Sequence, residues 1–420
     1  MNDRELSENW RTASLQYAKA INEYVARGRR DGWKAAGTTP EDNRQQLAPL
    51  VIEAVRNANR NVPFRSVRAD FPPAWEPFIG LLKENGQSLE PMQWLDNSRL
   101  ALHVGPIYET GPVVSLSESE IVEQPAILNF GRSPCGTFCV WANEAGLEIR
   151  RGWGGPITAR IPWGDTPSGE QGIKASQIIA FPDGQQVLLV GGFGVFVLSP
   201  SRVTRLLPLA AELVEPLTED LSDVLSMPHG AVSSTGEFIL AGSQDSYHLV
   251  FDAQLNQVAA IAPHSEYPHF AWFSTDGQLA AFNSCHFYNG ISIGIRVDDL
   301  KHASTEFGES DSRIRVLEEG SRVYAAVARN DELIVGDANG YIRAFDLDGK
   351  FRWEHFIGST INSLDLSPDK RLLAVTSYAG FCCVLELDSP EPDPFAIGSN
   401  AQRELWRWVF WKGEERPLRW

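Results

Sequence analysis

Thiols and imidazoles are the first side chains in this sequence that could do catalytic or metal chemistry. The eight histidines are scattered, with no His-Glu-x-x-His pair of the kind that holds catalytic zinc. His264 and His269, on either side of Tyr267-Pro268, come nearest to a metal-binding pair. Five cysteines lack the Cys-x-x-Cys spacing of a zinc or redox site, namely Cys135, Cys139, Cys285, Cys382 and Cys383. We expect mostly buried, reduced thiols and no resident metal or cofactor.

Signatures of phosphate binding and of nucleophilic catalysis are also missing. Gly191-Gly-Phe-Gly194 is rich in glycine, but it joins two predicted strands and opens no helix, so it lacks the helix N-terminus that holds a phosphate. The sequence contains neither a Gly-x-Ser-x-Gly elbow nor a P-loop. We therefore predict that the chain is not an enzyme.

Carboxylates are the chemically active side chains that this sequence concentrates. Residues 210–228 contain five of them and no Lys or Arg, and residues 298–311 contain five more. A third, smaller group is Glu118, Glu120 and Glu123. The ten candidate partner-binding residues are Glu212, Glu215, Glu219, Asp220, Asp223, Asp298, Asp299, Glu306, Glu309 and Asp311.

Two interpretations of these acidic segments stay open. They are either solvated loops that keep the protein soluble, or connections between structural repeats that gather on one face of the fold. In the second case their charges would sum into a field that attracts a basic partner and speeds its capture.

The overall charge favours a basic partner and argues against direct binding of nucleic acid. The 420 residues include 37 Lys or Arg and 54 Asp or Glu, a net charge of −17, whereas phosphate contacts need clustered cations. The charge is uneven, because residues 1–90 carry 13 basic and 12 acidic side chains and residues 91–420 carry 24 and 42, a net charge of −18. This step in composition suggests a domain boundary.

Hydropathy argues against a membrane protein. No window approaches the ~20 apolar residues that a membrane span needs. The first ten residues are charged where the apolar core of a signal peptide would lie. We expect a cytoplasmic protein.

The elements that position these side chains change type near residue 90. Before it, apolar residues from Leu6 to Tyr24 recur every three or four positions, the period of an amphipathic helix, with Ser7 as its predicted N-cap. Thr39-Pro40-Glu41-Asp42 predicts the start of a second helix, which Pro49 breaks or restarts. A third helix is expected at about residues 74–84. Residues 1–90 therefore predict a small helical domain.

After residue 91 the sequence repeats a unit with two turns. Short apolar runs flank polar turns such as Phe181-Pro-Asp-Gly184 and Ser367-Pro-Asp-Lys370. The first turns end at residues 98, 136, 184, 236, 277, 331 and 370, and the second turns fall at residues 111, 146, 194, 246, 290, 340 and 380. Two hairpin turns imply three antiparallel strands, and the apolar run before the next unit supplies a fourth. Seven such units predict a mainly β fold, a seven-bladed β-propeller over residues 91–420.

Two of these units resemble known repeats. Residues 336–353 are similar to a quinoprotein-like (PQQ-type) blade, and residues 362–375 resemble the inner strands of a WD40 blade. Phe345-Asp346 and Leu387-Asp388 stand where the Trp-Asp pair of a WD40 repeat would. The chain is thus similar to the WD40-like and quinoprotein-like propeller superfamilies, which include both binding platforms and enzymes.

The quinoprotein resemblance raises the question of a cofactor at Cys382-Cys383, because some cofactor-bearing members of that class carry vicinal cysteines. Those members also need an export signal and a calcium-binding set of carboxylates and amides, which we do not find in this sequence. Neighbouring residues of a strand face opposite sides, so we predict one thiol in the blade core and the other against the next blade.

The C-terminal run Leu405-Trp-Arg-Trp-Val-Phe-Trp411 alternates, so that Trp406, Trp408 and Phe410 share one face. We predict a strand that completes the first or last blade and closes the ring. The alternative is an aromatic contact for a partner, since Trp is enriched at binding hot spots.

Three functional hypotheses follow. The leading one is a non-enzymatic, acidic cytoplasmic binding protein that neutralises a basic partner such as a nuclease toxin, in the manner of bacterial immunity proteins. The second is a general WD40-type scaffold subunit of a multiprotein complex. The third is a propeller enzyme of quinoprotein or lactonase type, which predicts a bound metal or cofactor.

Overall fold

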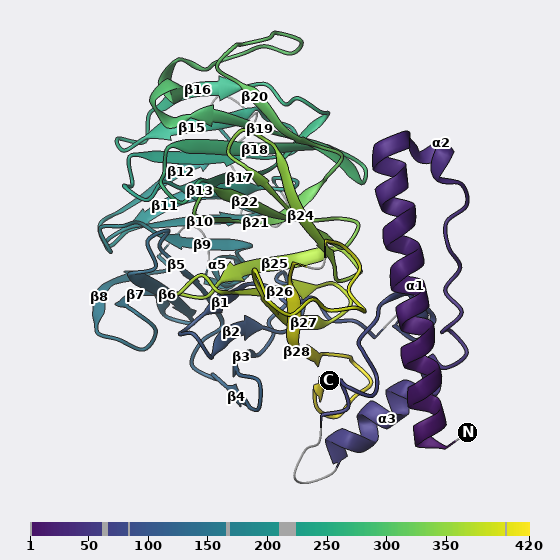
Figure 1. Cartoon of the computed structure of the whole chain (residues 1–420). Helices are drawn as coiled ribbons and strands as arrows, with labels where there is room; N and C mark the ends of the chain where they lie inside the picture. Colours follow the sequence, from purple (N-terminus) through teal and green to yellow (C-terminus); the bar gives the residue numbers. More distant parts are fainter. Residues whose placement is uncertain (1, 61–65, 83–84, 165–168, 210–223, 400) are drawn as a thin grey trace.

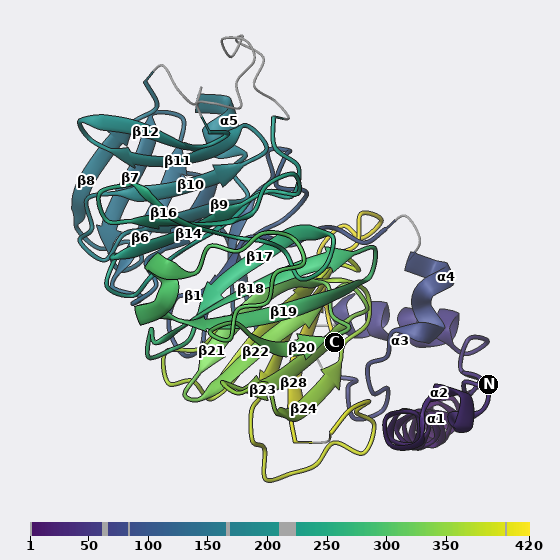
Figure 2. The same ribbon diagram turned by 90° about the horizontal axis from the view of Figure 1, so that it is seen from above.

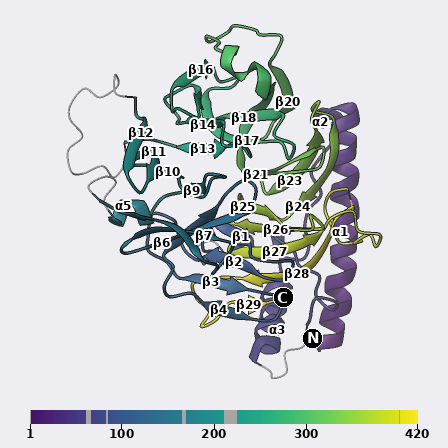
Figure 3. The same cartoon turned by 90° about the vertical axis from the view of Figure 1, so that its left-hand side faces the viewer.

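The computed structural model describes residues 2–60, 66–82, 85–164, 169–209, 224–399 and 401–420. Seven antiparallel sheets stand around a common axis, as the view along that axis in Figure 3 shows, so the predicted mainly β, seven-bladed β-propeller is confirmed. A long N-terminal helix, α1 (Asp3–Asp31), precedes the first blade and runs along the edge of the ring (Figure 1).

Each blade has four consecutive strands, a to d, from the axis outwards, and the last blade has a fifth. Blades 1 and 2 are β1 (Met92–Trp94), β2 (Leu100–His103), β3 (Val113–Leu116), β4 (Ile121–Glu123), and β5 (Asn129–Arg132), β6 (Phe138–Asn143), β7 (Gly146–Arg151), β8 (Ile157–Pro162). Blades 3 and 4 are β9 (Gln177–Ala180), β10 (Val187–Gly191), β11 (Gly194–Ser199), β12 (Arg202–Leu207), and β13 (His229–Val232), β14 (Phe238–Gly242), β15 (His248–Asp252), β16 (Gln257–Ile261). Blades 5 and 6 are β17 (Tyr267–Phe273), β18 (Leu279–His286), β19 (Asn289–Arg296), β20 (Arg315–Glu319), and β21 (Val323–Arg329), β22 (Glu332–Asp337), β23 (Tyr341–Asp346), β24 (Phe351–Phe356). Blade 7 is β25 (Ile361–Leu366), β26 (Leu372–Ser377), β27 (Phe381–Glu386), β28 (Arg403–Val409) and β29 (Leu418–Arg419).

The turn pattern of the sequence corresponds to the first two hairpins of every blade. In four blades the a-to-b turn uses one device, in which a serine hydroxyl accepts the backbone N–H five residues later at 2.9–3.0 Å; these serines are Ser133, Ser233, Ser274 and Ser367. Glycines of the same turns, such as Gly136 with φ 71°, adopt the left-handed conformation that side chains disfavour. The local chemistry of the turn explains why the repeat is visible in the sequence.

Strand order defines two faces of the ring. Because neighbouring strands are antiparallel, the a-to-b and c-to-d turns lie on one face, here called the lower face. The b-to-c turns and the connections from one blade to the next lie on the opposite, upper face. Every surface described below is placed by this rule.

The ring closes without exchange of strands between its ends. β1 of blade 1 packs beside β25 of blade 7, and the Trp94 backbone N–H donates to the buried Asp365 carboxylate at 2.6 Å. Arg132 of blade 2 forms an ion pair with the same carboxylate. This carboxylate therefore ties three blades together at the closure.

The aromatic C-terminal strand completes the last blade as β28. Trp406, Trp408 and Phe410 are buried in the hydrophobic cluster between blades 7 and 1, and Trp408 Nε1 donates to the Ser117 carbonyl oxygen at 2.9 Å. The alternative of an exposed aromatic contact for a partner is therefore wrong.

The cysteines occupy structural positions. Cys382 belongs to the cluster between blades 7 and 1, whereas Cys383 belongs to the cluster shared with blade 6. The prediction that the two thiols face opposite sides of the strand is confirmed. Among all five cysteines only Cys135 is exposed.

The helices begin at other residues than the sequence suggested. α1 starts at Asp3, where the Asn2 side chain accepts the Glu5 backbone N–H at 2.9 Å, so the predicted cap at Ser7 is wrong. The segment from Thr39 to Asp42 starts no helix, because the Asp42 carboxylate binds Arg44 instead. The other helices of the described residues are α2 (Trp33–Ala36), α3 (Ala48–Arg60), η1 (Glu76–Phe78), α4 (Ile79–Leu82), α5 (Gly169–Ile173) and η3 (Val297–His302).

The N-terminal helices share a hydrophobic core with blades 6 and 7, and Figure 2 shows α1, α2, α3 and α4 gathered at one side of the ring. The ring centroids of Trp10, in α1, and Phe78 are 5.5 Å apart, and those of Phe78 and the C-terminal Trp420 are 5.3 Å apart. Trp420 Nε1 donates to the Phe71 carbonyl oxygen at 2.7 Å. The two ends of the chain are thus packed together, and a separate domain over residues 1–90 stays a prediction.

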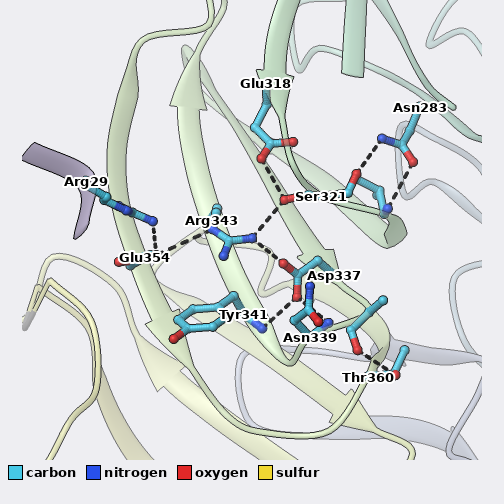
Figure 4. A network of polar contacts seen from close by, with 12 residues as sticks. Arg29, Asn283, Glu318, Ser321, Asp337, Asn339, Tyr341, Arg343, Glu354 and Thr360 are labelled. Atoms are coloured by element: carbon cyan, nitrogen blue, oxygen red, sulfur yellow. Dashed lines mark hydrogen bonds and ion pairs between the residues drawn. The ribbon is translucent and has the colours of Figure 1, made fainter. Parts of the chain in front are cut away.

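A polar network fixes the distal half of α1 to blade 6 (Figure 4). Arg29 of α1 forms an ion pair with Glu354, which also lies 3.5 Å from Arg343. Arg343 binds the fully buried Asp337 and donates to the Ser321 hydroxyl at 2.8 Å. Two arginines and two carboxylates therefore connect the helix to the interface of blades 5 and 6.

Candidate protein-binding site

The ten acidic residues singled out in the sequence do not form one surface. Glu212, Glu215, Glu219, Asp220 and Asp223 lie outside the described residues. The chain on both sides of them is on the upper face, where the Leu225 backbone N–H donates to the Gly192 carbonyl oxygen at 2.8 Å and the Gln244 N–H to that of Ser226 at 2.8 Å. Their segment does join two blades, β12 of blade 3 and β13 of blade 4, as predicted.

The second acidic segment, residues 298–311, lies between strands c and d of blade 5, so the prediction that it joins two blades is wrong. Asp298 and Asp299 are in η3, which begins at the lower face, where the Val297 N–H donates to the Gln278 carbonyl oxygen. Asp311 forms an ion pair with Arg313 at 2.5 Å. That partner neutralises the charge of Asp311.

Residues 303–309 of this segment run along the outer edge of blade 4 from the lower to the upper face. Glu306 and Glu309 therefore lie at the upper rim. The Thr305 backbone N–H donates to the Ala260 carbonyl oxygen at 3.0 Å, beside β16. At the upper end the Tyr247 hydroxyl donates to Glu306 at 2.9 Å, and this hydrogen bond raises the pKa of Tyr247. Two of the ten predicted residues thus lie on the upper rim beside Tyr247.

Further carboxylates on the upper rim come from turns that the sequence analysis did not select. Glu266 accepts the Tyr267 hydroxyl at 2.6 Å and contacts His286, and these two partners lower its pKa. Asp245, in the neighbouring turn, is exposed and acts electrostatically on Tyr267. The upper rim of blades 4 and 5 therefore carries carboxylates from three separate segments.

Large exposed aromatic rings accompany these carboxylates. Phe287 and Tyr288 form the b-to-c turn of blade 5 and are 73% and 65% exposed, and Phe307, 61% exposed, packs on Tyr247 with ring centroids 5.8 Å apart. We call this set the rim surface, defined as Asp245, Glu266, Phe287, Tyr288, Glu306, Phe307 and Glu309. Exposed aromatic side chains surrounded by a polar rim are typical of protein-binding surfaces.

Arg322, on the connection between blades 5 and 6, supports the Phe287 turn. Its guanidinium donates to the Phe287 carbonyl oxygen at 3.0 Å, to His269 Nε2 at 3.2 Å and to Met227 Sδ at 3.5 Å. Phe287 has a φ of 52°, a left-handed conformation that is strained for a bulky residue. Residues held in strained backbone conformations cluster at binding and catalytic sites.

Nearer the axis, the upper face carries a second cluster of polar and aromatic side chains. Arg322 lies over the Tyr324 ring at 5.0 Å, and the Tyr324 and Tyr378 rings meet edge to face at 6.3 Å. Burial raises the pKa of the nearby Glu90 to about 7, against hydrogen bonds from Asn362 and Ser88 that lower it. Burial, and after it the charge of Glu90, raise the pKa of Tyr378.

The imidazoles of this region are structural. His269 Nδ1 contacts the Val323 carbonyl oxygen at 2.6 Å, and its other nitrogen accepts from Arg322, so His269 does not form the metal-binding pair with His264 that the sequence suggested. Burial lowers the pKa of His269 to about 3. Within the described residues, no group of three or more His, Cys, Asp or Glu side chains is placed to hold a metal ion.

The rim surface was missed because its aromatic members sit in a turn. A signal is present, since the b-to-c turn of blade 5 is Phe287-Tyr288 where the corresponding turn of blade 2 has Glu144-Ala145. Two bulky aromatic residues at the tip of a two-residue turn have no core to fill.

Among the described helices none is long and apolar enough to cross a membrane.

Comparison with known proteins adds a likeness of fold. No protein-family model matches the chain, and no curated protein matches its sequence. Among solved structures, the chain is similar to the β-propeller domain of Myceliophteria thermophila Cps50 (Swd1), with 11% sequence identity and a TM-score of 0.45. The alignment covers 66% of this chain and 90% of that domain.

Proposed function

We propose that this protein is a non-enzymatic binding propeller that docks a basic protein on its rim surface. The observation that carries this proposal is the pairing of exposed aromatic rings with carboxylates on the upper rim of blades 4 and 5. Phe287, Tyr288 and Phe307 are the rings, and Glu266, Glu306 and Glu309 lie among them. The rings would supply buried contact area, and the carboxylates would steer the partner into place.

The electrostatic setting supports a basic partner. The propeller residues 91–420 carry a net charge of −18. Leu209 and Leu225, which flank the five acidic residues at positions 212–223 in the sequence, pack against the same hydrophobic cluster as Tyr247. A field of one sign on one face raises the association rate of an oppositely charged protein and makes that rate sensitive to salt.

The finer proposal is that the partner is a nuclease toxin and that the protein acts in the cytoplasm as its inhibitor. A nuclease has a cationic cleft for its substrate, and a carboxylate-rich surface is complementary to such a cleft. A gene for a secreted nuclease next to this gene would support the proposal, and so would the loss of nuclease activity when the two proteins are mixed. A general scaffold subunit, the alternative, would capture several partners and inhibit none of them.

Charge reversal tests the proposal directly. The double variant Glu266→Lys/Glu306→Lys raises the net charge of the rim surface by four, and Glu120→Lys/Glu123→Lys makes the same change at exposed positions of the β3–β4 hairpin of blade 1. Tagged proteins would be purified from their native cells at low and high salt, and the captured proteins identified by mass spectrometry. We expect a basic protein that is lost from the first variant and kept by the second.

Capture that survives both double variants would contradict the proposed surface. Metal analysis and an absorption spectrum of the purified protein separate the proposal from the enzyme hypothesis, which requires a bound metal or cofactor.

A further inference from the structure

A cleft of about 710 Å³ separates the end of α1 from the outer strands of blades 5 and 6, within the size range of ligand-binding pockets. Arg29 and Trp33 form one wall, and β20 and β24 form the other. Figure 3 shows the end of α1 and α2 beside these two blades. Asn289, which follows the Phe287-Tyr288 turn, also lines the cleft, so the cleft opens next to the rim surface.

The floor of the cleft holds a carboxylate with an unused oxygen. Glu318 Oε1 accepts the Ser321 hydroxyl at 2.7 Å, whereas Oε2 is buried and has no hydrogen-bond partner among the described residues. Arg343 is close by, but its hydrogen bonds and ion pairs go to Ser321, Asp337 and Glu354 (Figure 4). Burial raises the pKa of Glu318. A buried acceptor without a donor is costly, and a cation entering the cleft would supply the donor.

Two aromatic rings lie at the mouth of the cleft, and the glycine that makes room for one of them destabilises α1. Trp33 is 56% exposed and Phe351 is 46% exposed. Gly28 seats Trp33, because a Cβ atom at residue 28 would overlap the indole ring, and a glycine inside a helix costs about 1 kcal/mol relative to alanine. Gly32, with φ 89°, then turns the chain so that Trp33 faces the cleft. α1 is therefore less stable at Gly28, and the Trp33 ring that packs there stays largely exposed.

One ring of the cleft already holds a guanidinium. Arg29 lies over the Phe351 ring at 4.6 Å and forms its ion pair with Glu354. Trp33, the first residue of α2, has no such cation over it among the described residues. Stacking on an indole is the strongest of the common cation–π contacts, and a planar guanidinium also matches a carboxylate.

We propose that this cleft receives the guanidinium of an arginine side chain from the protein that docks on the rim surface. The Glu318 carboxylate turns its Oε2 out of its buried position to accept from the guanidinium, which stacks on Trp33, while the exposed Glu319 adds a second negative charge at the entrance. The inference deepens the proposed function, because it names the side chain that the partner inserts beside its main contact. The inference rests on the proposed function in one respect, namely that the partner is a protein.

The test uses a defined probe in place of the partner. The full chain is labelled with 5-fluorotryptophan, the Trp33 resonance is assigned with Trp33→Phe, and the peptide acetyl-Gly-Arg-Gly-amide is titrated by fluorine NMR. The control probe replaces arginine with citrulline, which keeps the shape and loses the charge. We expect a saturable shift of the Trp33 resonance with the arginine peptide and none with the citrulline peptide.

Matched variants locate the contact. Glu318→Gln keeps the side-chain volume and should lower the affinity for the arginine peptide by about tenfold. A loss of this size is the usual consequence of removing one charged hydrogen bond. Glu120→Gln removes an exposed carboxylate of the β3–β4 hairpin, outside both the cleft and the rim surface, and should leave the affinity for the peptide unchanged. No shift at Trp33, an equal shift with citrulline, or full affinity in Glu318→Gln would overturn the proposal.

A rim variant separates this inference from the proposed function. Phe287→Ala removes an aromatic contact of the rim surface and leaves the cleft unchanged. If the rim surface binds no partner, capture is the same in wild type and Phe287→Ala, while the arginine peptide still shifts Trp33. If the cleft is wrong, the peptide result fails while capture still depends on Phe287.

Discussion

The guanidinium of Arg322 donates a hydrogen bond to the carbonyl oxygen of Phe287 at 3.0 Å, across the gap between the blade 5–6 connection and the b-to-c turn of blade 5. The bond holds Phe287 in a left-handed conformation with its ring 73% exposed. Arg322 is itself held by His269 and Met227. The most exposed aromatic ring of the rim surface therefore depends on blade 5 and on the connections between blades 3 and 4 and between blades 5 and 6.

Substitution of Phe287 should separate folding from binding. Phe287→Gly and Phe287→Ala both remove the ring, but only glycine adopts φ 52° without strain. We expect the glycine variant to be more stable than the alanine variant by about 1 kcal/mol, as measured by urea unfolding, and both to lose partner capture. Equal unfolding midpoints would show that the turn relaxes and is not strained.

The pKa of Glu90 predicts a stability change near neutral pH. Its folded-state pKa is about 7 and its ordinary value is 4.5, so the folded protein binds more protons than the unfolded chain between these values. The free energy of unfolding should therefore fall as pH rises from 4.5 to 7, by up to about 3 kcal/mol from this group.

Glu90→Gln should remove this loss, because the amide stays neutral. In urea unfolding, the free energy of unfolding of wild type should be lower at pH 8 than at pH 5. In the variant this difference should be smaller. A wild type and a variant that respond identically to pH would refute the burial of a titrating carboxyl group at this position.

Buried histidines predict a loss of stability in acid. Burial lowers the pKa of His229 from 6.5 to about 4, so the unfolded chain binds the extra proton in this window and stability falls as pH drops from 6.5. At pH 5 this one residue accounts for about 2 kcal/mol. His229→Gln should lose less stability between pH 7 and pH 5 than wild type. An equal loss would point to other groups, among them His248, whose pKa burial also lowers.

The packing of the two chain ends predicts a large effect at Trp420. This residue is 2% exposed, packs edge to face on Phe78 and donates to the Phe71 carbonyl oxygen. Trp420→Ala should cost about 3–5 kcal/mol in the free energy of unfolding. Trp33→Ala, the same change at an exposed ring, is the matched control and should have little effect. Similar values for the two variants would contradict the packing of the helices on blades 6 and 7.

The propeller was predictable from the sequence because its repeat is local. Each a-to-b turn satisfies its own backbone, as the Ser133 hydroxyl does with the Phe138 N–H, so the pattern needs no knowledge of distant contacts. The vicinal thiols Cys382 and Cys383 were likewise placed by strand geometry alone. The long insertion at residues 297–314 was misplaced, because a repeat period shows that a unit is longer but not which of its connections has grown.

The rim surface could not be predicted because the closed ring assembles it. Tyr247 and Glu306 are 59 residues apart in the sequence, and Arg322 and Phe287 are 35 apart. The helix errors have the same origin: the predicted start at Thr39 failed because Asp42 pairs with Arg44, which lies against the rings of Trp10 and Tyr17. Such choices depend on tertiary contacts that a local pattern does not contain.

Photocrosslinking from the rim surface in the native cells tests the central claim most directly. A benzophenone amino acid would replace Tyr288 on the rim or Val203 on β12, which is 48% exposed on blade 3 and serves as the control. We predict one discrete crosslinked protein from position 288, lost in the Glu266→Lys/Glu306→Lys background, and no such product from position 203. The same product from both positions, or one from position 288 that survives charge reversal, would contradict the account.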